Sequence, residues 1–107
     1  MKMDVVSAYP IEMRIRALPG VAIAELTCSS APCQVEGTLT DGRHFYLRTR
    51  SSYTGLGVGD SPGGAVQDWY ENSERMPCVH VDIDNHCSDH VCCYDGLMTI
   101  ISDGWPA

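Results

Sequence analysis

Hydrophobic and polar residues alternate along much of this chain. Alternation at every second position places apolar side chains on one face of an extended backbone, so each such run predicts a half-buried β-strand. The runs cover residues 11–18, 34–40, 43–50 and 78–84. Shorter apolar segments over residues 21–27 and 53–58 predict two further strands, with one or two helical turns as the alternative over 21–27.

Glycine marks two places in this predicted sheet. Asp41-Gly42 supplies the positive φ angles of a two-residue turn, which joins residues 34–40 and 43–50 as a hairpin. Gly55, Gly57 and Gly59 all fall on one face of the strand that follows. That face has no side chains, so another backbone can approach it closely.

Two segments have helical spacing. Residues 65–75 place Val66, Trp69 and Tyr70 inward, after a loop at 61–64 and before a break at Pro77. Residues 95–102 carry apolar residues at helical spacing behind Asp95, a candidate N-cap.

These elements predict a small α+β protein. Helices are not regularly interleaved with strands, as a parallel sheet requires. We therefore expect one domain over residues 1–107, with an antiparallel sheet of four to six strands and one or two short helices. The hairpin over 34–50 is expected at the centre of the sheet, with the C-terminal helix on one face.

Composition and charge narrow the function classes. The 107 residues are 44% hydrophobic and carry a net charge of −7, as expected for one acidic globular domain. Residues 1–53 hold six basic and five acidic side chains, whereas residues 54–107 hold one and nine. A negative field repels nucleic acid and attracts the basic surfaces that hold it. No apolar run is long enough to span a membrane, and the N-terminus lacks the apolar core of a secretory signal, so we expect a cytoplasmic protein.

Cysteine and histidine are concentrated between Cys78 and Cys93, which contains seven of the ten such residues in the chain. Zinc takes four nitrogen or sulfur ligands, and a structural site can be drawn from Cys87, His90 and Cys92 with His86 or Cys78 as the fourth ligand. No Cys-x2-Cys pair is present, and Cys92 and Cys93 would point to opposite sides of a β-like run. We therefore expect reduced core thiols and no cofactor, with bound zinc or a disulfide as the alternatives.

A second candidate for metal chemistry overlaps this segment. His80, Asp82 and Asp84 share one face of a predicted strand, where a divalent cation with hydrolytic chemistry can bind. The simpler interpretation is a solvated strand face. The chain also lacks a Gly-x-Ser-x-Gly nucleophile elbow and a phosphate-binding Gly-Lys-Ser/Thr. We therefore expect a non-enzymatic protein and keep a small metal-dependent hydrolase as the alternative.

The segment Asp41-Gly-Arg-His-Phe-Tyr-Leu-Arg-Thr-Arg50, followed by a glycine-rich strand and an acidic second half, resembles small uncharacterised proteins of bacteriophages and prophages. The resemblance covers about 20 of the 107 residues and amounts to a Gly-Arg-x-Phe-Tyr-x-Arg-x-Arg hairpin. It implies a context, since such small acidic proteins include inhibitors of host defence, anti-CRISPR proteins among them, which occupy a surface on a larger complex. No functional residue is carried over from it.

The charge and the resemblance together predict an inhibitor that binds a protein partner with a basic surface, a nucleic-acid-handling host complex. Carboxylates on a rigid sheet can meet the Arg and Lys side chains that otherwise hold phosphates. Direct binding to nucleic acid or to a membrane is not expected. The residues expected to contact the partner are Asp68, Glu71, Glu74, Asp82, Asp84, Tyr46 and Arg48. The alternative is a hydrolase or a structural zinc-binding module that uses the Cys/His/Asp cluster over 78–93.

Overall fold

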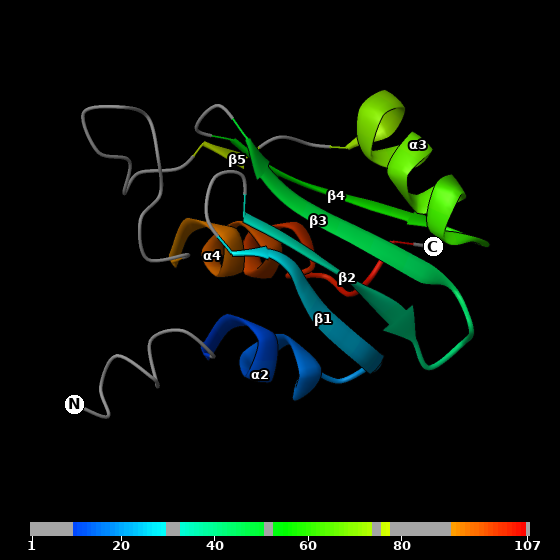
Figure 1. The fold of residues 1–107 in the computed structure, drawn as a ribbon, viewed down its shortest axis with the longest axis horizontal. Coiled ribbons are helices and arrows are strands. Elements are labelled where there is room, and N and C mark those ends of the chain that lie inside the picture. Colours follow the sequence, from blue (N-terminus) through cyan, green and yellow to red (C-terminus); the bar gives the residue numbers. More distant parts are fainter. Residues whose placement is uncertain (1–9, 30–32, 51–52, 74–75, 78–90, 107) are drawn as a thin grey trace.

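The computed structural model describes residues 10–29, 33–50, 53–73, 76–77 and 91–106. The elements are α2 (Pro10–Arg16), β1 (Val21–Ser29), β2 (Cys33–Leu39), β3 (His44–Arg50), β4 (Tyr53–Gly59), α3 (Pro62–Asn72), β5 (Met76–Pro77) and α4 (Val91–Ile100). The strands form one antiparallel sheet in the order β1-β2-β3-β4-β5, with β3 in the middle (Figure 1). The predicted α+β fold with an antiparallel sheet is confirmed.

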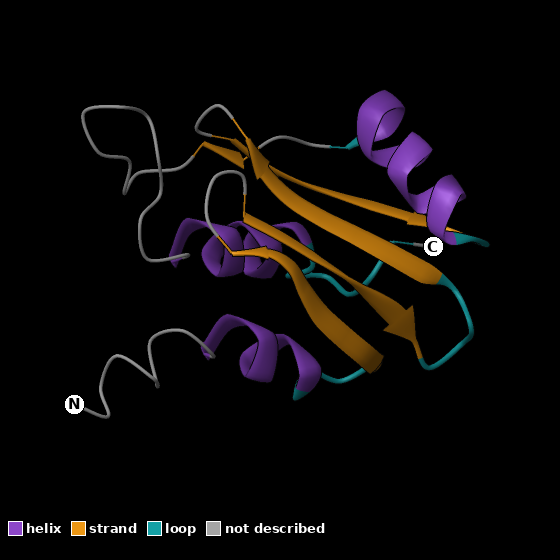
Figure 2. Ribbon diagram, viewed as in Figure 1, coloured by secondary structure: helices purple, strands orange, loops and turns teal. Residues whose placement is uncertain are grey.

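Helices lie on both sides of the sheet (Figure 2). On one side, α2 and α4 pack against strand residues to form the main core, which includes Ile15 of α2, Leu97 of α4 and the strand residues Val35, Phe45 and Leu47. On the other side, α3 packs on β3 and β4. The predicted strands over 21–27 and 53–58 are present as β1 and β4, and the C-terminal helix covers one face as expected.

The glycine face of β4 positions α3. A Cβ atom at Gly57 would stand 2.1 Å from the Ala65 carbonyl oxygen and 2.5 Å from the Trp69 backbone nitrogen. The helix backbone therefore rests directly on a strand face that has no side chains, as the glycine spacing predicts. The side chain of Asp68 adds a tether, since its Oδ2 accepts a hydrogen bond of 2.8 Å from the Val58 backbone N–H.

The prediction of a strand over residues 11–18 is wrong, because this segment forms α2. Ile11 and Ile15 are buried, whereas Met13 is 60% exposed. Positions 11 and 15 share a face in a helix as well as in a strand, so the alternation did not separate the two structures. Pro10 stands at the start of the helix, where a missing N–H costs nothing.

Both remaining helices begin earlier than predicted. Ser61 caps α3 by accepting a 2.9 Å hydrogen bond from the Gly64 N–H, and Pro62 is the first helical residue, so the segment expected as a loop is the first turn. The helix α4 begins at Val91, which places Asp95 inside it rather than at its N-cap. The strand predicted over 78–84 lies outside the described residues.

The β2–β3 hairpin has a three-residue loop instead of the predicted two-residue turn. The Leu39 N–H donates to the Arg43 carbonyl at 2.8 Å, the Gly42 N–H donates to the Leu39 carbonyl at 3.0 Å, and Gly42 has a φ of 92°. The resulting register pairs Val35 with Leu47. A two-residue turn at Asp41-Gly42 would shift this register by one residue and set the apolar positions of one strand against the polar positions of the other.

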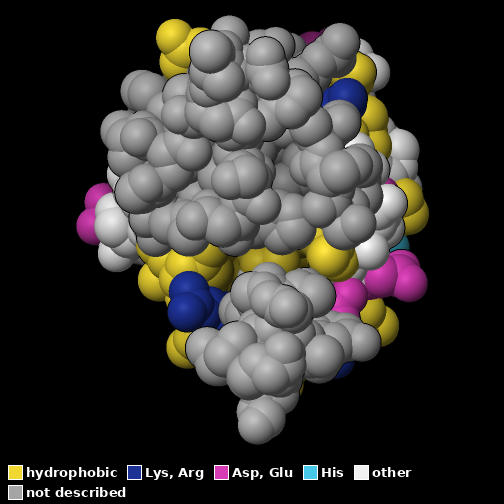
Figure 3. Space-filling view, turned by 60° about the vertical axis from the view of Figure 1, so that its left-hand side comes forward, with side chains coloured by type: hydrophobic (Ala, Val, Ile, Leu, Met, Phe, Trp, Pro, Cys, Tyr) yellow, Lys and Arg dark blue, Asp and Glu magenta, His cyan; other side chains and the backbone are white. Residues whose placement is uncertain are grey.

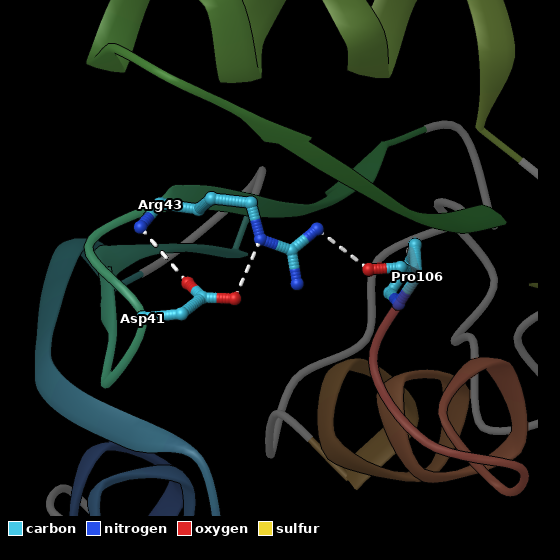
Figure 4. A network of polar contacts seen from close by, with 3 residues as sticks. All are labelled: Asp41, Arg43 and Pro106. Atoms are coloured by element: carbon cyan, nitrogen blue, oxygen red, sulfur yellow. Dashed lines mark hydrogen bonds and ion pairs between the residues drawn. The ribbon is translucent and has the colours of Figure 1, made fainter.

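The C-terminal segment after α4 closes one end of the core. The Trp105 ring lies 5.5 Å from the Phe45 ring, and its Nε1 donates a 3.1 Å hydrogen bond to the Pro19 carbonyl. Arg43, which follows the hairpin loop, donates a 2.6 Å hydrogen bond to the Pro106 carbonyl and pairs with Asp41 (Figure 4). Trp105 and Pro106 therefore connect the turn at Pro19 with the β2–β3 hairpin.

Candidate functional site

Half of one sheet face is left uncovered by the described helices. Because α3 packs over β3 and β4, the same side of β1 and β2 carries no described helix. Strand alternation directs six side chains to this side, and we call them the open face: Ile23, Glu25 and Thr27 of β1, with Gln34, Glu36 and Thr38 of β2.

Ile23 is the apolar residue of the open face. It pairs with Thr38 across the strands, next to an irregularity in the β1–β2 register, and it is 58% exposed. Its neighbour Ala24 points to the opposite side and is buried in the main core. The β1 strand therefore has an apolar residue on each side, one in the core and one in solvent.

Two carboxylates of the open face stand opposite each other. Glu25 and Glu36 are direct partners in the β1–β2 register. Glu36 Oε2 accepts hydrogen bonds from Thr27 Oγ1 at 2.8 Å and from Gln34 Nε2 at 3.1 Å. The ion pairs within the described part of the chain are Glu12–Arg16 and Asp41–Arg43, so no described cation neutralises this pair. Like charges at directly opposed positions destabilise a sheet.

A shallow depression of about 160 Å³ opens on this face beside the first turn of α3. Pro62 of α3 and His44 of β3 border it together with open-face residues; its full lining is Ile23, Glu25, Glu36, Gly37, Thr38, His44, Phe45 and Pro62. The open face is therefore bounded on one side by α3.

The edge of the sheet next to the open face is covered by α2. Leu26 donates its backbone N–H to Glu12 Oε2 at 2.7 Å, and Arg16 Nη2 donates to the Ala24 carbonyl at 2.8 Å. Glu12 and Arg16 also pair with each other at 3.2 Å. Glu12 and Arg16 thus hydrogen-bond the two outward-pointing backbone groups that flank Glu25, one N–H and one carbonyl. A single residue of a parallel neighbouring strand would bond the same two groups. The sequence signal was an acidic and a basic residue four positions apart, which the strand prediction concealed.

Tyr46 and Arg48, predicted as partner contacts, lie between α3 and the open face. Tyr46 is 5% exposed and meets the Trp69 ring edge-on at 6.0 Å. Its hydroxyl donates to Gln34 Oε1 at 3.2 Å and accepts from Arg48 Nη1 at 3.1 Å. The Arg48 guanidinium lies 5.5 Å from the centre of the Trp69 ring. Both residues therefore link α3 to the open face through Trp69 and Gln34. Their contact with a partner stays a prediction.

The two described acidic residues predicted on α3 face away from the open face. Asp68 accepts from Val58 with one oxygen and from Asn72 Nδ2, at 2.8 Å, with the other. Glu71 is exposed and accepts a hydrogen bond from Gln67. Glu74, Asp82 and Asp84 lie outside the described residues. The structure thus does not bring Asp68 and Glu71 together with Glu25 and Glu36, which sequence reasoning missed because their pairing depends on the strand register.

The metal-binding alternatives fall almost entirely outside the described residues: Cys78, His80, Asp82, Asp84, His86, Cys87 and His90. Cys92 and Cys93 belong to α4, so the expectation that they occupy a β-like run is wrong. Among the residues that the structure describes, no group of three or more His, Cys, Asp or Glu side chains is placed to hold a metal ion.

The side of the molecule that Figure 3 brings forward has charges of both signs. In the coloured part of that surface, hydrophobic side chains form a band with Lys or Arg at one end and Asp or Glu at the other. The open face differs, because both of its charged side chains are carboxylates.

Within the described ranges, no helix has the length and hydrophobicity needed to cross a bilayer.

Comparison with known proteins adds no family to this description, since no family model, curated protein or solved structure matches the chain.

Proposed function

We propose that the protein is a non-enzymatic inhibitor that docks on a basic, nucleic-acid-handling surface of a host defence complex. The observation that carries this proposal is the open face, where Glu25 and Glu36 stand opposite each other without a described cation beside an exposed isoleucine. A partner that supplies Arg or Lys there relieves a repulsion that the free protein bears. The choice of a host defence complex rests on the resemblance to small acidic phage proteins.

The net charge of −7 supports a basic partner in the same way. Complementary potentials raise the rate of encounter and disfavour partners of the wrong sign, and this steering weakens as salt screens it. An acidic protein that occupies a phosphate-binding surface competes directly with DNA or RNA, because both present negative charge to the same cations.

The test begins by capturing partners from a host lysate at low salt with the immobilised chain of 107 residues. Each captured protein is then purified, and its affinity for its own DNA or RNA is measured by gel shift with and without this protein. We expect the partner's affinity for nucleic acid to fall at least about tenfold, and excess nucleic acid to displace this protein from the partner.

A partner whose nucleic-acid binding is unchanged by saturating amounts of this protein contradicts the proposal. The proposal is also contradicted if this protein retains no partner from the lysate at low salt and, when purified, hydrolyses a phosphoester or peptide substrate in the presence of a divalent cation. The second result would establish the hydrolase alternative.

A further inference from the structure

We propose that the open face receives a basic amphipathic helix of the partner, lying beside α3 across β1 and β2. This inference rests on the proposed function and specifies the surface and the kind of element that binds there. It moves the contact from the predicted acidic residues of α3 to Ile23, Glu25 and Glu36.

The spacing of the sheet leaves room for one helix. The helix α3 packs on β3 and β4. Adjacent strands are about 4.8 Å apart, so the middle of the β1–β2 pair lies about 9.6 Å from the middle of the β3–β4 pair. Helices pack side by side at about 8–10 Å. A helix centred over β1 and β2 therefore contacts both the sheet and α3.

The side of α3 that borders the open face is suited to such packing. Ala65 and Trp69 are buried against the sheet, and Asp68 reaches the outer edge of β4. With 3.6 residues per turn, the stripe on the opposite flank contains Pro62, Val66 and Tyr70. Pro62 borders the same depression as Ile23, which agrees with this orientation, and Tyr70 is 54% exposed.

A strand is a poorer occupant than a helix. A strand would add to the sheet at the β1 edge, using the outward backbone groups of that edge. Glu12 and Arg16 of α2 already bond the Leu26 N–H and the Ala24 carbonyl there. The helix that provides them is held by Ile11 and Ile15 in the main core. The middle of this edge is therefore occupied, whereas the face beside it carries no described helix.

Charge complementarity specifies a basic helix. Glu25 and Glu36 are paired across the strands, and Ile23 projects from the same side of β1 two residues before Glu25. An amphipathic helix that places apolar residues on Ile23 and on the α3 flank can place a Lys or Arg one turn away, over the two carboxylates. Both charges then become paired where the free protein leaves them opposed.

The test uses a defined probe in place of the unidentified partner. The probe is a stapled helical peptide of about 15 residues, long enough to match a seven-residue strand, with Leu on one face and Lys flanking it. Its controls are a peptide of the same composition without the amphipathic order and a peptide with Glu in place of Lys. We expect saturable binding of the first peptide, with amide shifts in NMR spectra centred on β1, β2 and the Pro62–Tyr70 flank, and at least about tenfold weaker binding of the controls.

Two variants of the open face and one matched control locate the site. Ile23→Ser should weaken the peptide about tenfold, and Glu25→Gln about two- to fivefold while raising the melting temperature of the free protein. Met13→Ser, at a residue of α2 that is as exposed as Ile23, should leave binding unchanged. Shifts centred on Asp68 and Glu71, or equal effects of Ile23→Ser and Met13→Ser, overturn the proposal.

The outcomes separate this inference from the proposed function. A partner whose nucleic-acid binding is inhibited equally by the wild type, Ile23→Ser and Glu25→Gln leaves the function standing and overturns the open face as its site. If the peptide binds at the open face but no partner is found whose nucleic-acid binding falls, the open face stands as a helix-binding site and the proposed function is contradicted. Self-association of the free protein that Ile23→Ser abolishes would identify a second copy as the occupant and also overturn the proposal.

Discussion

Asp41 secures the β2–β3 loop with both oxygens of its side chain. Oδ1 accepts a hydrogen bond of 3.0 Å from the Arg43 backbone N–H, and Oδ2 accepts one of 2.9 Å from the Arg43 side-chain Nε. The backbone hydrogen bond from Arg43, supported by the hydrogen bond and charge of the Arg43 side chain, holds the pKa of Asp41 below its ordinary value of 3.8. The ionised carboxylate therefore favours the folded state.

The lowered pKa predicts a pH-dependent effect of Asp41→Asn. A carboxylate with a depressed pKa stabilises the folded protein above its unfolded-state pKa, and this contribution is lost as the pH falls through the folded-state value. The loss of melting temperature in Asp41→Asn should thus be complete at about pH 6 and shrink progressively below 3.8.

Thermal melts between about pH 6 and pH 2.5 test this prediction. Asp60→Asn, at an exposed position in the loop before α3, is the matched control and should not reproduce the trend. An equal loss of melting temperature in Asp41→Asn at both ends of the range would show that the turn depends on side-chain shape and not on charge.

At the scale of elements, the packing of α3 depends on the bare glycine face of β4. We predict that Gly57→Ala destabilises the protein by about 2–3 kcal/mol, because the new Cβ meets backbone atoms of α3 and forces the helix away from the sheet. Chemical denaturation measures the change in the free energy of unfolding.

Gly63→Ala is the control for this change. A Cβ at Gly63, in the first turn of α3, has nothing within 4 Å. Alanine also favours helix over glycine by up to about 1 kcal/mol, so this variant should be more stable than the wild type. Loss of stability in both variants would indicate that the helix itself, and not its contact with β4, is the sensitive feature.

The same scale shows which elements sequence patterns can identify. The hairpin strands β2 and β3 were predicted because alternation over seven residues on each side of an Asp-Gly pair indicates a hairpin. The register followed the alternation, and the loop is one residue longer than the predicted turn. The α2 segment was mispredicted because Ile11 and Ile15 fit the helical period as well as the strand period, and the exposure of Met13 is what rules out the strand. Short segments of this kind are decided by what they pack against.

At the scale of the whole molecule, Trp105 joins parts of the chain that are far apart in sequence. Its indole contacts Phe45 of β3 and bonds the Pro19 carbonyl before β1, while the adjacent Pro106 accepts from Arg43. We predict that Trp105→Ala lowers the free energy of unfolding by about 2 kcal/mol, from the loss of buried apolar surface and this hydrogen bond.

A loss of this size corresponds to a fall in melting temperature of roughly 10 °C for a domain of this length. Met13→Ala, at an exposed residue on α2, should change stability by less than about 0.5 kcal/mol. A Trp105→Ala protein that melts like the wild type would contradict the role of the C-terminal segment in closing the core.

The sequence by itself determined the features that depend on neighbouring residues. Strand periodicity and turn residues predicted β2, β3 and the antiparallel α+β class. The glycine spacing of β4 predicted a close contact with another backbone, which is that of α3. The acidic balance, which favours a basic partner, is also a property of composition alone. These features need no knowledge of distant parts of the chain.

Only the tertiary structure decided where the candidate site lies. Glu25 meets Glu36 because the β1–β2 register aligns them, and that register follows from burying Ala24 and Val35 on the other side of the sheet. The open face exists because α3 is confined to the glycine face of β4 and to β3, while α2 closes the edge of β1. Each is a long-range contact whose partner no local pattern names, since alternation tells which side chains share a face and not what covers it.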